Sequence, residues 1–196
     1  MPVPRFDPHT ALVVVDCQND FADPSGSLYV TGADRAIVAI NQAIAAALSA
    51  GAPVFYTQDW HPPSTPHFEK DGGIWPVHCV AGTTGAELHP DLVVEGPVVR
   101  KGANGEDGYS GFTMRDPVSG DETPTELDNL LRAAGVARVV VGGLALDYCV
   151  KATAIDAARL GYDTMVPLEL TAPVELRPGD GAAAAAAMRE SGARVD

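Results

Sequence analysis

Three reactive side chains, Asp16, Lys101 and Cys149, stand where predicted buried strands end or have just ended. The carboxyl ends of parallel strands meet at one edge of a sheet, so the three groups are predicted to converge. There Asp16 could take the thiol proton and later give it to a leaving amine, while Lys101 holds both anions in their charged forms. Taken singly, each has a plainer interpretation, as a turn aspartate, a solvated lysine or a small buried cysteine.

Cys149 is predicted to lie at or just inside the start of a helix, after a buried strand that ends at Gly142 and Gly143. The partial positive charge of a helix amino terminus stabilises a thiolate, which is the reactive form of cysteine. The glycines permit a tight strand-to-helix turn, and free backbone N–H groups there could hold an oxyanion. This environment favours a nucleophilic thiol, provided that Asp16 and Lys101 lie beside it.

A second group of polar residues suits a metal ion. Four of the five histidines fall between residues 61 and 89, and Asp59 and His61 share one side of an extended segment. His67 and His78 follow in the same long stretch. Histidine and carboxylate ligands with open positions describe a catalytic zinc or iron site rather than a closed structural one. A loop with several surface histidines is the alternative, and the residues alone do not choose between the two.

An alternation of predicted strands and helices must position these side chains. Predicted strands cover residues 11–15, 53–57, 98–101, 138–142 and 164–167, with a final one ending at Val195. Predicted helices cover residues 33–50, 126–134, 150–160 and 181–191. This alternation implies right-handed crossovers and a parallel sheet covered by helices on both faces. The stretch 62–93 shows no sustained period, and a loop of that length is usually functional or disordered.

Composition and charge narrow the class of protein. With 196 residues the chain is long enough for one domain, which we expect to span residues 1–196. The formal net charge of −13 argues against a nucleic-acid or anionic-membrane partner, because no basic surface is left to neutralise phosphates. No apolar run approaches the ~20 residues of a membrane span, and Met1–Arg5 lacks the apolar core of a secretory signal. Three cysteines without a CxxC pair fit a reducing compartment, so we expect a cytoplasmic protein whose homo-oligomerisation stays open.

Six short blocks occur in order along the chain: DCQNDF at 16–21, TQDWHPP at 57–63, WPVHCV at 75–80, RKG at 100–102, YSGF at 109–112 and GLALDYCV at 143–150. Together they resemble the nicotinamidase/pyrazinamidase branch of the isochorismatase-like hydrolases, and the match runs from Ala11 to Pro173. Each block alone is moderately specific, and six in order are highly specific. The resemblance implies a three-layer α/β/α fold with a six-stranded parallel sheet and helices on both faces.

The activity that this resemblance implies is hydrolysis of nicotinamide to nicotinate and ammonia through a cysteine thioester, with pyrazinamide as a further substrate and a role in NAD salvage. The catalytic triad maps to Asp16, Lys101 and Cys149. The oxyanion hole maps to the backbone N–H groups of Ala145 and Cys149, after a cis peptide bond. Contacts to the pyridine ring map to Phe21, Trp75, Tyr109 and Leu144.

The resemblance also implies one divalent metal ion, with zinc first and iron or manganese as alternatives. Its ligands map to Asp59, His61 and His78, and His67 matches a further ligand position that some members use. In this scheme the metal ion binds the pyridine nitrogen and so orients the ring.

The chain departs from the family pattern at Leu146, where a threonine is usual, and at Cys17, which we interpret as a core residue. An isochorismatase would lack Cys149, and a carbamoyl amidase of the same superfamily would lack the metal-binding loop. A zinc hydrolase whose metal activates water, with an inert Cys149, is an alternative from another class. A non-catalytic metal-binding protein on the same fold is the least favoured alternative, although fold alone does not determine function.

Overall fold

The central strand of the sheet, β1 (Thr10–Val15), is buried along its whole length. Leu12 and Val14 belong to one core cluster, while Val13 and Val15 belong to a second cluster on the other side of the sheet. Successive residues of a strand point to opposite faces, so a strand covered on both faces has to be apolar throughout. The unbroken apolar run therefore encodes a strand in the middle of three layers.

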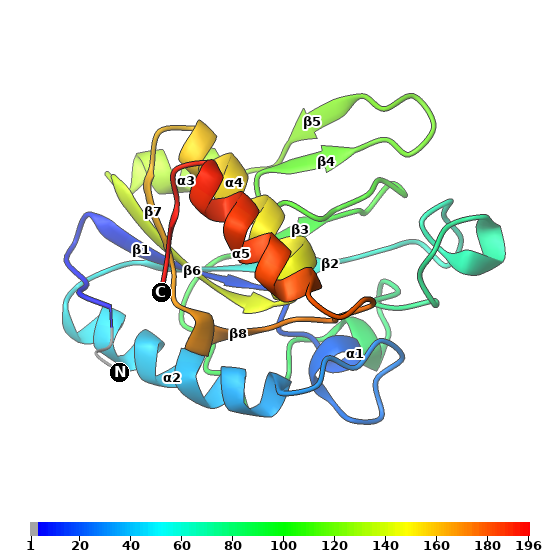
Figure 1. Cartoon of the computed structure of the whole chain (residues 1–196), viewed down its shortest axis with the longest axis horizontal. Helices are drawn as coiled ribbons and strands as arrows, with labels where there is room; N and C mark the ends of the chain where they lie inside the picture. The colour runs from blue at the N-terminus through cyan, green and yellow to red at the C-terminus, as the bar shows by residue number, and fades with distance from the viewer. Residues whose placement is uncertain (1–3) are drawn as a thin grey trace.

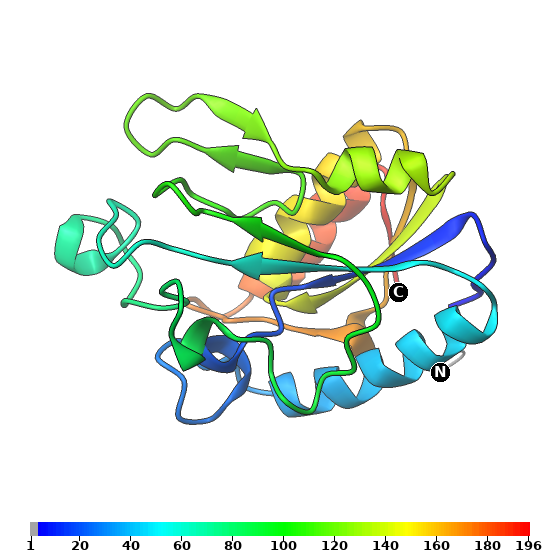
Figure 2. The same cartoon turned by 180° about the vertical axis from the view of Figure 1, so that it is seen from behind.

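The computed structural model describes residues 4–196, and its main sheet consists of parallel strands (Figures 1 and 2). Besides β1, these are β2 (Val54–Asp59), β3 (Val98–Lys101), β6 (Arg138–Leu144), β7 (Asp163–Val166), β8 (Thr171–Ala172) and β9 (Arg194–Val195). The strand order is β3-β2-β1-β6-β7-β9, and the short strand β8 pairs with β6. The predicted six-stranded parallel sheet is confirmed, with β8 as a short addition. Residues 1–3, which belong to the segment Met1–Arg5 considered above, lie outside the described residues.

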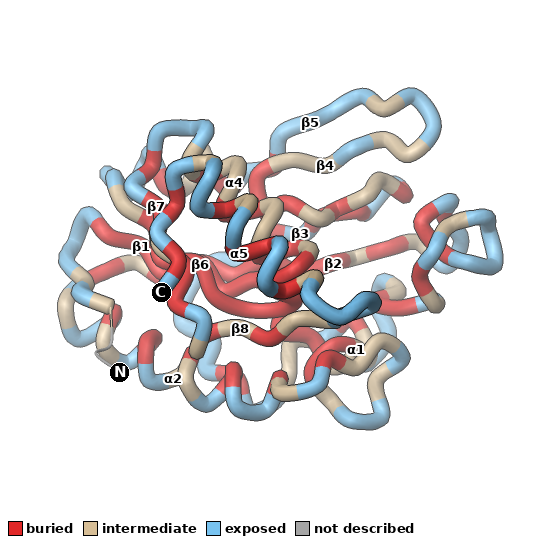
Figure 3. Tube along the Cα trace, in the orientation of Figure 1, coloured by how far each residue is buried: buried red, intermediate tan, exposed pale blue. Residues whose placement is uncertain are grey.

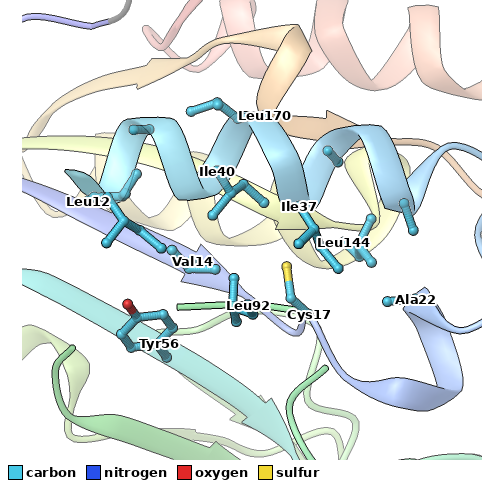
Figure 4. Packing of buried hydrophobic residues seen from close by; sticks show 14 of the residues in the cluster. Leu12, Val14, Cys17, Ala22, Ile37, Ile40, Tyr56, Leu92, Leu144 and Leu170 are labelled. Atoms are coloured by element: carbon cyan, nitrogen blue, oxygen red, sulfur yellow. The ribbon is translucent and has the colours of Figure 1, made fainter. Parts of the chain in front are cut away.

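Helices cover the sheet on both faces, as the predicted three-layer fold requires (Figures 1 and 2). One face is covered by α2 (Ala33–Ser49), and the other by α3 (Leu127–Ala133), α4 (Lys151–Arg159) and α5 (Asp180–Glu190). Figure 4 shows Ile37 and Ile40 of α2 packed over the sheet residues Leu12 and Val14. Gly51 follows α2 with φ +70, the left-handed conformation expected of a glycine that ends a helix. No helix among residues 4–196 is both long and apolar enough to cross a membrane.

The structure adds elements that the sequence patterns do not predict. They are the short helix α1 (Asn19–Ala22) and a hairpin formed by β4 (Thr113–Arg115) and β5 (Glu122–Pro124). Strand β2 extends two residues beyond its predicted end, because Asp59 pairs with Lys101 of β3. The helix predicted over residues 150–160 begins at Lys151, and a single π-helical turn (Leu146–Val150) precedes it.

The long stretch after β2 folds back onto the carboxyl edge of the sheet. An isolated parallel bridge pairs His61 with Val80, and a second one pairs Phe68 with Trp75. His61 and Phe68 are fully buried, and Trp75 is nearly so. Figure 3 shows buried segments in this loop as well as in the central strands. A loop of this length was expected to be either functional or disordered, and in the structure it is ordered and partly buried.

The strand order places a topological switch point between β1 and β6. From β1 the chain continues through β2 to β3 on one side, and from β6 it continues through β7 to β9 on the other. Such a point opens a crevice at the carboxyl edge, where parallel α/β sheets bind their ligands. Val15 pairs in register with Gly143, so Asp16 and Leu144 leave the sheet side by side.

Gly143 should tolerate no side chain. Its φ is +122, and a Cβ built on it would lie 2.1 Å from the backbone oxygen of Val15. Gly161, which follows α4, has φ +92 and nothing within 4 Å of its Cβ position. We expect Gly161→Ala to lower the unfolding free energy by about 1–2 kcal/mol through backbone strain, and Gly143→Ala to lower it by at least about 4 kcal/mol. Urea unfolding of both variants measures the difference, and equal losses would contradict the predicted clash.

Candidate active site

The structure brings Asp16, Lys101 and Cys149 together at the carboxyl edge of the sheet, beside the switch point. Lys101 Nζ lies 2.7 Å from Asp16 Oδ2 and 4.0 Å from Cys149 Sγ. Asp16 follows β1, Lys101 ends β3, and Cys149 lies in the π-helical turn between β6 and α4. Asp16 and Lys101 are fully buried, while Cys149 lines the adjacent cavity. Three segments that are far apart in sequence therefore deliver these groups to one point.

The Lys101 ammonium is the positive charge at the centre of this cluster. Besides Asp16, its Nζ contacts Asp59 Oδ1 at 2.5 Å and the backbone oxygen of Gly108. Burial alone would lower the pKa of Lys101, but the carboxylates of Asp16 and Asp59 raise it well above its usual value. The donor atoms of Asp16, Asp59 and Cys149 lie within 4.8 Å of one another. The ammonium already supplies the cation that this group would otherwise attract.

The two carboxylates beside Lys101 have pKa values that are driven apart. Burial raises the pKa of Asp16 to about 6 despite Lys101, and Asp59 pushes it in the same direction. A hydrogen bond of 2.7 Å from Thr57 Oγ1 to Asp16 Oδ1 opposes this rise. Burial also disfavours the ionised form of Asp59, but Lys101 and His61 hold its pKa far below the usual range. Asp59 therefore remains an anion, while Asp16 can gain and lose a proton near neutral pH.

Burial favours the neutral thiol form of the Cys149 side chain. Burial raises its pKa well above the usual value; Lys101 opposes this shift, and Asp16 and Asp59 add to it. Burial therefore opposes the stabilisation of a thiolate that is expected from a helix amino terminus. A base must take the proton before the sulfur can attack, and Asp16 is poised for that task.

The peptide bond between Leu144 and Ala145 is cis, as the resemblance implies. The N–H groups of Tyr148 and Val150 then both donate to the Ala145 carbonyl, which closes the turn. The predicted substrate contact of Leu144 is not made by its side chain, which is 1% exposed and packs in the core under α2. Alternation along β6 turns the Leu144 side chain to the same face as Val140. Ala145, the next residue, lines the cavity instead.

His61, His67 and His78 form a cluster in which one ring nitrogen of each lies within 4.8 Å of the others. His61 follows β2, and the other two come from the long loop after it. His67 Nδ1 lies 2.7 Å from Asp107 Oδ1, and His78 Nδ1 lies 2.7 Å from the Pro76 carbonyl oxygen. Since a carboxylate and a carbonyl only accept hydrogen bonds, both rings carry their proton on Nδ1 and present a lone pair on Nε2.

These donors fit a metal ion. Both ring nitrogens of His61 are buried without a hydrogen-bond partner in the described part of the chain, and an orphaned buried polar group is costly unless something binds it. Asp59 Oδ2 lies 3.7 Å from His61 Nε2. Burial lowers the pKa of His78 to about 4, which keeps this imidazole in its neutral, metal-binding form. Imidazoles with a carboxylate suit a divalent transition metal.

An aromatic cavity adjoins Cys149 and the histidine cluster. Phe21, Trp75 and Tyr109, which the resemblance assigns to ring contacts, all line it, and Tyr148 joins them. Trp75 Nε1 donates a hydrogen bond of 2.8 Å to the Tyr109 hydroxyl. Trp75 also meets Tyr148 edge to face, with ring centroids 4.7 Å apart. Three rings from separate segments thus form one wall, against which a flat aromatic molecule can pack.

Sequence reasoning missed several residues that complete the cavity. Leu28, Val30 and Val174 add apolar lining, and Tyr148 adds an aromatic ring. A single valine or leucine in a loop carries no signal beyond its hydrophobicity. The structure shows what places Val174 there. Buried Asp147 accepts a hydrogen bond of 2.9 Å on Oδ1 from the N–H of Val174 and so holds this segment over the site.

The family model for the isochorismatase domain matches residues 10–195. The chain belongs to this family. Within the isochorismatase family, the nicotinamidase/pyrazinamidase of Mycobacterium tuberculosis is 43% identical over 169 residues, which cover 84% of this chain and 87% of the relative.

Two solved structures share the isochorismatase-family fold and the parallel sheet of this chain. PnC1 from L. infantum, in complex with nicotinate, superposes with a TM-score of 0.86 at 35% identity, covering 96% of this chain and 92% of that chain. The pyrazinamidase of Pyrococcus horikoshii, in complex with zinc, superposes with a TM-score of 0.84 at 36% identity, covering 96% of this chain and 99% of that chain.

Replacing Lys101 in this isochorismatase-family protein should leave two buried carboxylates without a counter-charge. At pH 7, with a chelator present, we expect Lys101→Met to lower the unfolding free energy by about 3–5 kcal/mol. Without the cation, Asp16 and Asp59 bind protons more tightly in the folded state than in the unfolded chain. Stability of the variant therefore rises as the pH falls, so its deficit relative to the wild type should shrink between pH 7 and pH 5.

Urea unfolding at both pH values tests this expectation. Lys70→Met is the matched control, because the Lys70 side chain is 46% exposed and its loss should cost less than about 1 kcal/mol. A Lys101→Met deficit that is absent at pH 7, or that grows at pH 5, would refute the assigned charge balance.

Proposed function

We propose that this protein is a nicotinamidase, an amidohydrolase that converts nicotinamide to nicotinate and ammonia. One observation carries the proposal: Cys149, the buried pair of Asp16 and Lys101, and a histidine cluster suited to a metal ion converge on one aromatic cavity. The relatives support this substrate, since one is named a nicotinamidase/pyrazinamidase and another binds nicotinate. Pyrazinamide carries the same carboxamide on a flat nitrogen-containing ring, so we extend the proposal to it.

We assign the metal site to Asp59, His61 and His78, with His67 as a fourth ligand. Zinc suits this set of imidazole and carboxylate donors, with iron or manganese as alternatives. The similar pyrazinamidase of Pyrococcus horikoshii, which was crystallised with zinc, supports the choice. When bound, the metal ion supplies a Lewis acid for a pyridine nitrogen and so orients the ring.

The bond-making steps fall to the chain's own residues. Asp16 takes the proton of the Cys149 thiol, and the sulfur attacks the carboxamide carbon to form a C–S bond. The backbone N–H groups of Ala145 and Cys149 hold the oxyanion, while Lys101 stabilises the anions beside it. Asp16 then returns the proton to the amide nitrogen, the C–N bond breaks, and ammonia leaves.

Hydrolysis of the thioester restores the enzyme through the same carboxylate. Asp16 takes a proton from a water molecule, and the oxygen of that water attacks the thioester carbon. The C–S bond breaks, the sulfur regains a proton from Asp16, and the product acid loses its remaining proton to solvent and leaves as nicotinate. One residue with a pKa near neutrality thus serves as base and acid in both halves of the reaction.

Particular contacts disfavour the rival functions. A carbamoyl amidase without the metal-binding loop would have no use for three converging histidines. A zinc hydrolase with metal-activated water would have no use for the buried pair of Asp16 and Lys101 beside Cys149. All proposed site residues come from one chain. The three cysteines are buried and free, which supports a cytoplasmic location, where nicotinate would enter NAD salvage.

Ammonia release from nicotinamide should depend on both the thiol and the metal ion. We expect Cys149→Ala to lower turnover roughly 1000-fold or more, because the nucleophile is lost. Cys17→Ala is the matched control: Cys17 is buried in the core, its thiol donates only a weak hydrogen bond to Val15, and activity should survive. Treatment with a chelator should suppress turnover, and added zinc should restore it. Full activity of Cys149→Ala would exclude the proposed mechanism and favour the zinc-hydrolase alternative.

The acid limb of the pH profile should report Asp16. Below its pKa of about 6 this carboxyl is protonated and cannot accept the thiol proton, so kcat/KM should fall about tenfold per pH unit. Thr57→Val removes the hydrogen bond that lowers the pKa of Asp16, so it should move the limb to higher pH. Metal content is measured across the same range. A limb that follows metal loss, or that ignores Thr57→Val, would show that another group controls it.

A further inference from the structure

Asp107 lies outside the six sequence blocks, yet its carboxylate contacts the histidine cluster. Its Oδ1 lies 2.7 Å from His67 Nδ1. Two residues before each partner, Thr65 Oγ1 donates a hydrogen bond of 2.7 Å to the Gly105 carbonyl. The two loops are therefore joined at two points, by Thr65 with Gly105 and by His67 with Asp107. The contact is thus part of a fixed pairing between loops.

The backbone of Asp107 is held from the other direction as well. Its N–H donates to the Arg115 carbonyl at 2.7 Å, and the Arg115 N–H donates back at 3.0 Å. This bridge ties Asp107 to the end of β4 in the hairpin. The Asp107 side chain is 22% exposed, so the carboxylate keeps some contact with water while it faces the ring.

Neighbouring rings limit how His67 can lie. Its imidazole stacks on that of His61, with centroids 4.9 Å apart and planes at 25°, and Tyr109 lies 5.6 Å away. The remaining freedom is a flip of the ring and the choice of which nitrogen carries the proton. A carboxylate at Nδ1 settles both, because it accepts a hydrogen bond from that nitrogen alone. In the neutral ring, Nε2 then carries the lone pair that can bind a metal ion.

We propose that Asp107 is a positioning residue of the metal site, which makes His67 a ligand through Nε2. Carboxylates that accept from the second nitrogen of a ligating histidine fix its tautomer, orient its ring and raise its basicity. The inference rests on the metal site of the proposed function and does not depend on the substrate. The alternative is that His67 only forms an ion pair with Asp107 and binds no metal ion. In that case the metal affinity would not respond to a change at Asp107.

The test is the zinc affinity of the metal-free protein, measured by competition with a chromophoric chelator. We expect Asp107→Ala to weaken zinc binding roughly 10- to 100-fold. Asp107→Asn should lose less, because its amide oxygen still accepts from Nδ1. Glu106→Ala is the matched control: it removes a carboxylate from the same loop, but within residues 4–196 the Glu106 side chain accepts hydrogen bonds only from Asn104, so the affinity should change less than about threefold. Thermal unfolding of the metal-free variants verifies that each one folds.

A double-mutant cycle with His67→Ala distinguishes positioning from general damage. If Asp107 acts through His67, Asp107→Ala should weaken zinc binding no further in the His67→Ala protein. An equal loss in both backgrounds, or an Asp107→Ala affinity that matches Glu106→Ala, would overturn the proposal. A wild-type protein that binds no zinc would overturn it together with the metal site. Zinc binding without ammonia release from nicotinamide would refute only the proposed function, and the affinities would still decide the role of Asp107.

Discussion

The buried ammonium of Lys101 allows two carboxylates and a thiol to lie together in a buried site at the carboxyl edge of the sheet. Taken alone, Asp16 and Asp59 would repel each other and would each be costly to bury. Lys101 and His61 keep Asp59 ionised, while burial and the neighbouring Asp59 raise the pKa of Asp16, so that Asp16 becomes the proton carrier. Asp59 then turns its second oxygen toward His61. The same residue thus joins the nucleophilic half of the site to the metal-binding half.

Much of this arrangement could be predicted from the sequence, because strands buried on both faces are easy to recognise and their ends are polar. The apolar run before Asp16 and the glycine pair before Ala145 identified the two strands that flank the switch point. The crossover pattern then predicted the parallel sheet, and convergence of Lys101 and Cys149 followed from that geometry. Composition alone placed four of the five histidines between residues 61 and 89, but it did not choose between a metal site and a loop of surface histidines.

The rest depends on tertiary contacts that leave no local pattern. The pKa of the Cys149 thiol depends on burial and on charges from other strands, which its position near a helix start does not reveal. The Leu144 side chain turns away from the cavity because the strand alternation continues to its last residue. Leu28 and Val174 reach the cavity only because loops fold over it. Asp107 has no motif at all, and only the pairing of two loops reveals its contact with the cluster.

The loop between Lys101 and Gly108 has a consequence for how such chains diverge. It leaves the end of β3 and returns so that the Gly108 carbonyl meets the ammonium of the very lysine at which it began. One residue earlier, Asp107 reaches the histidines. Inserting or deleting a residue here would shift both contacts at once. Natural selection should therefore preserve the length of this loop even where its amino-acid sequence changes. The tip of the β4–β5 hairpin bears no such constraint, and evolution can lengthen it cheaply.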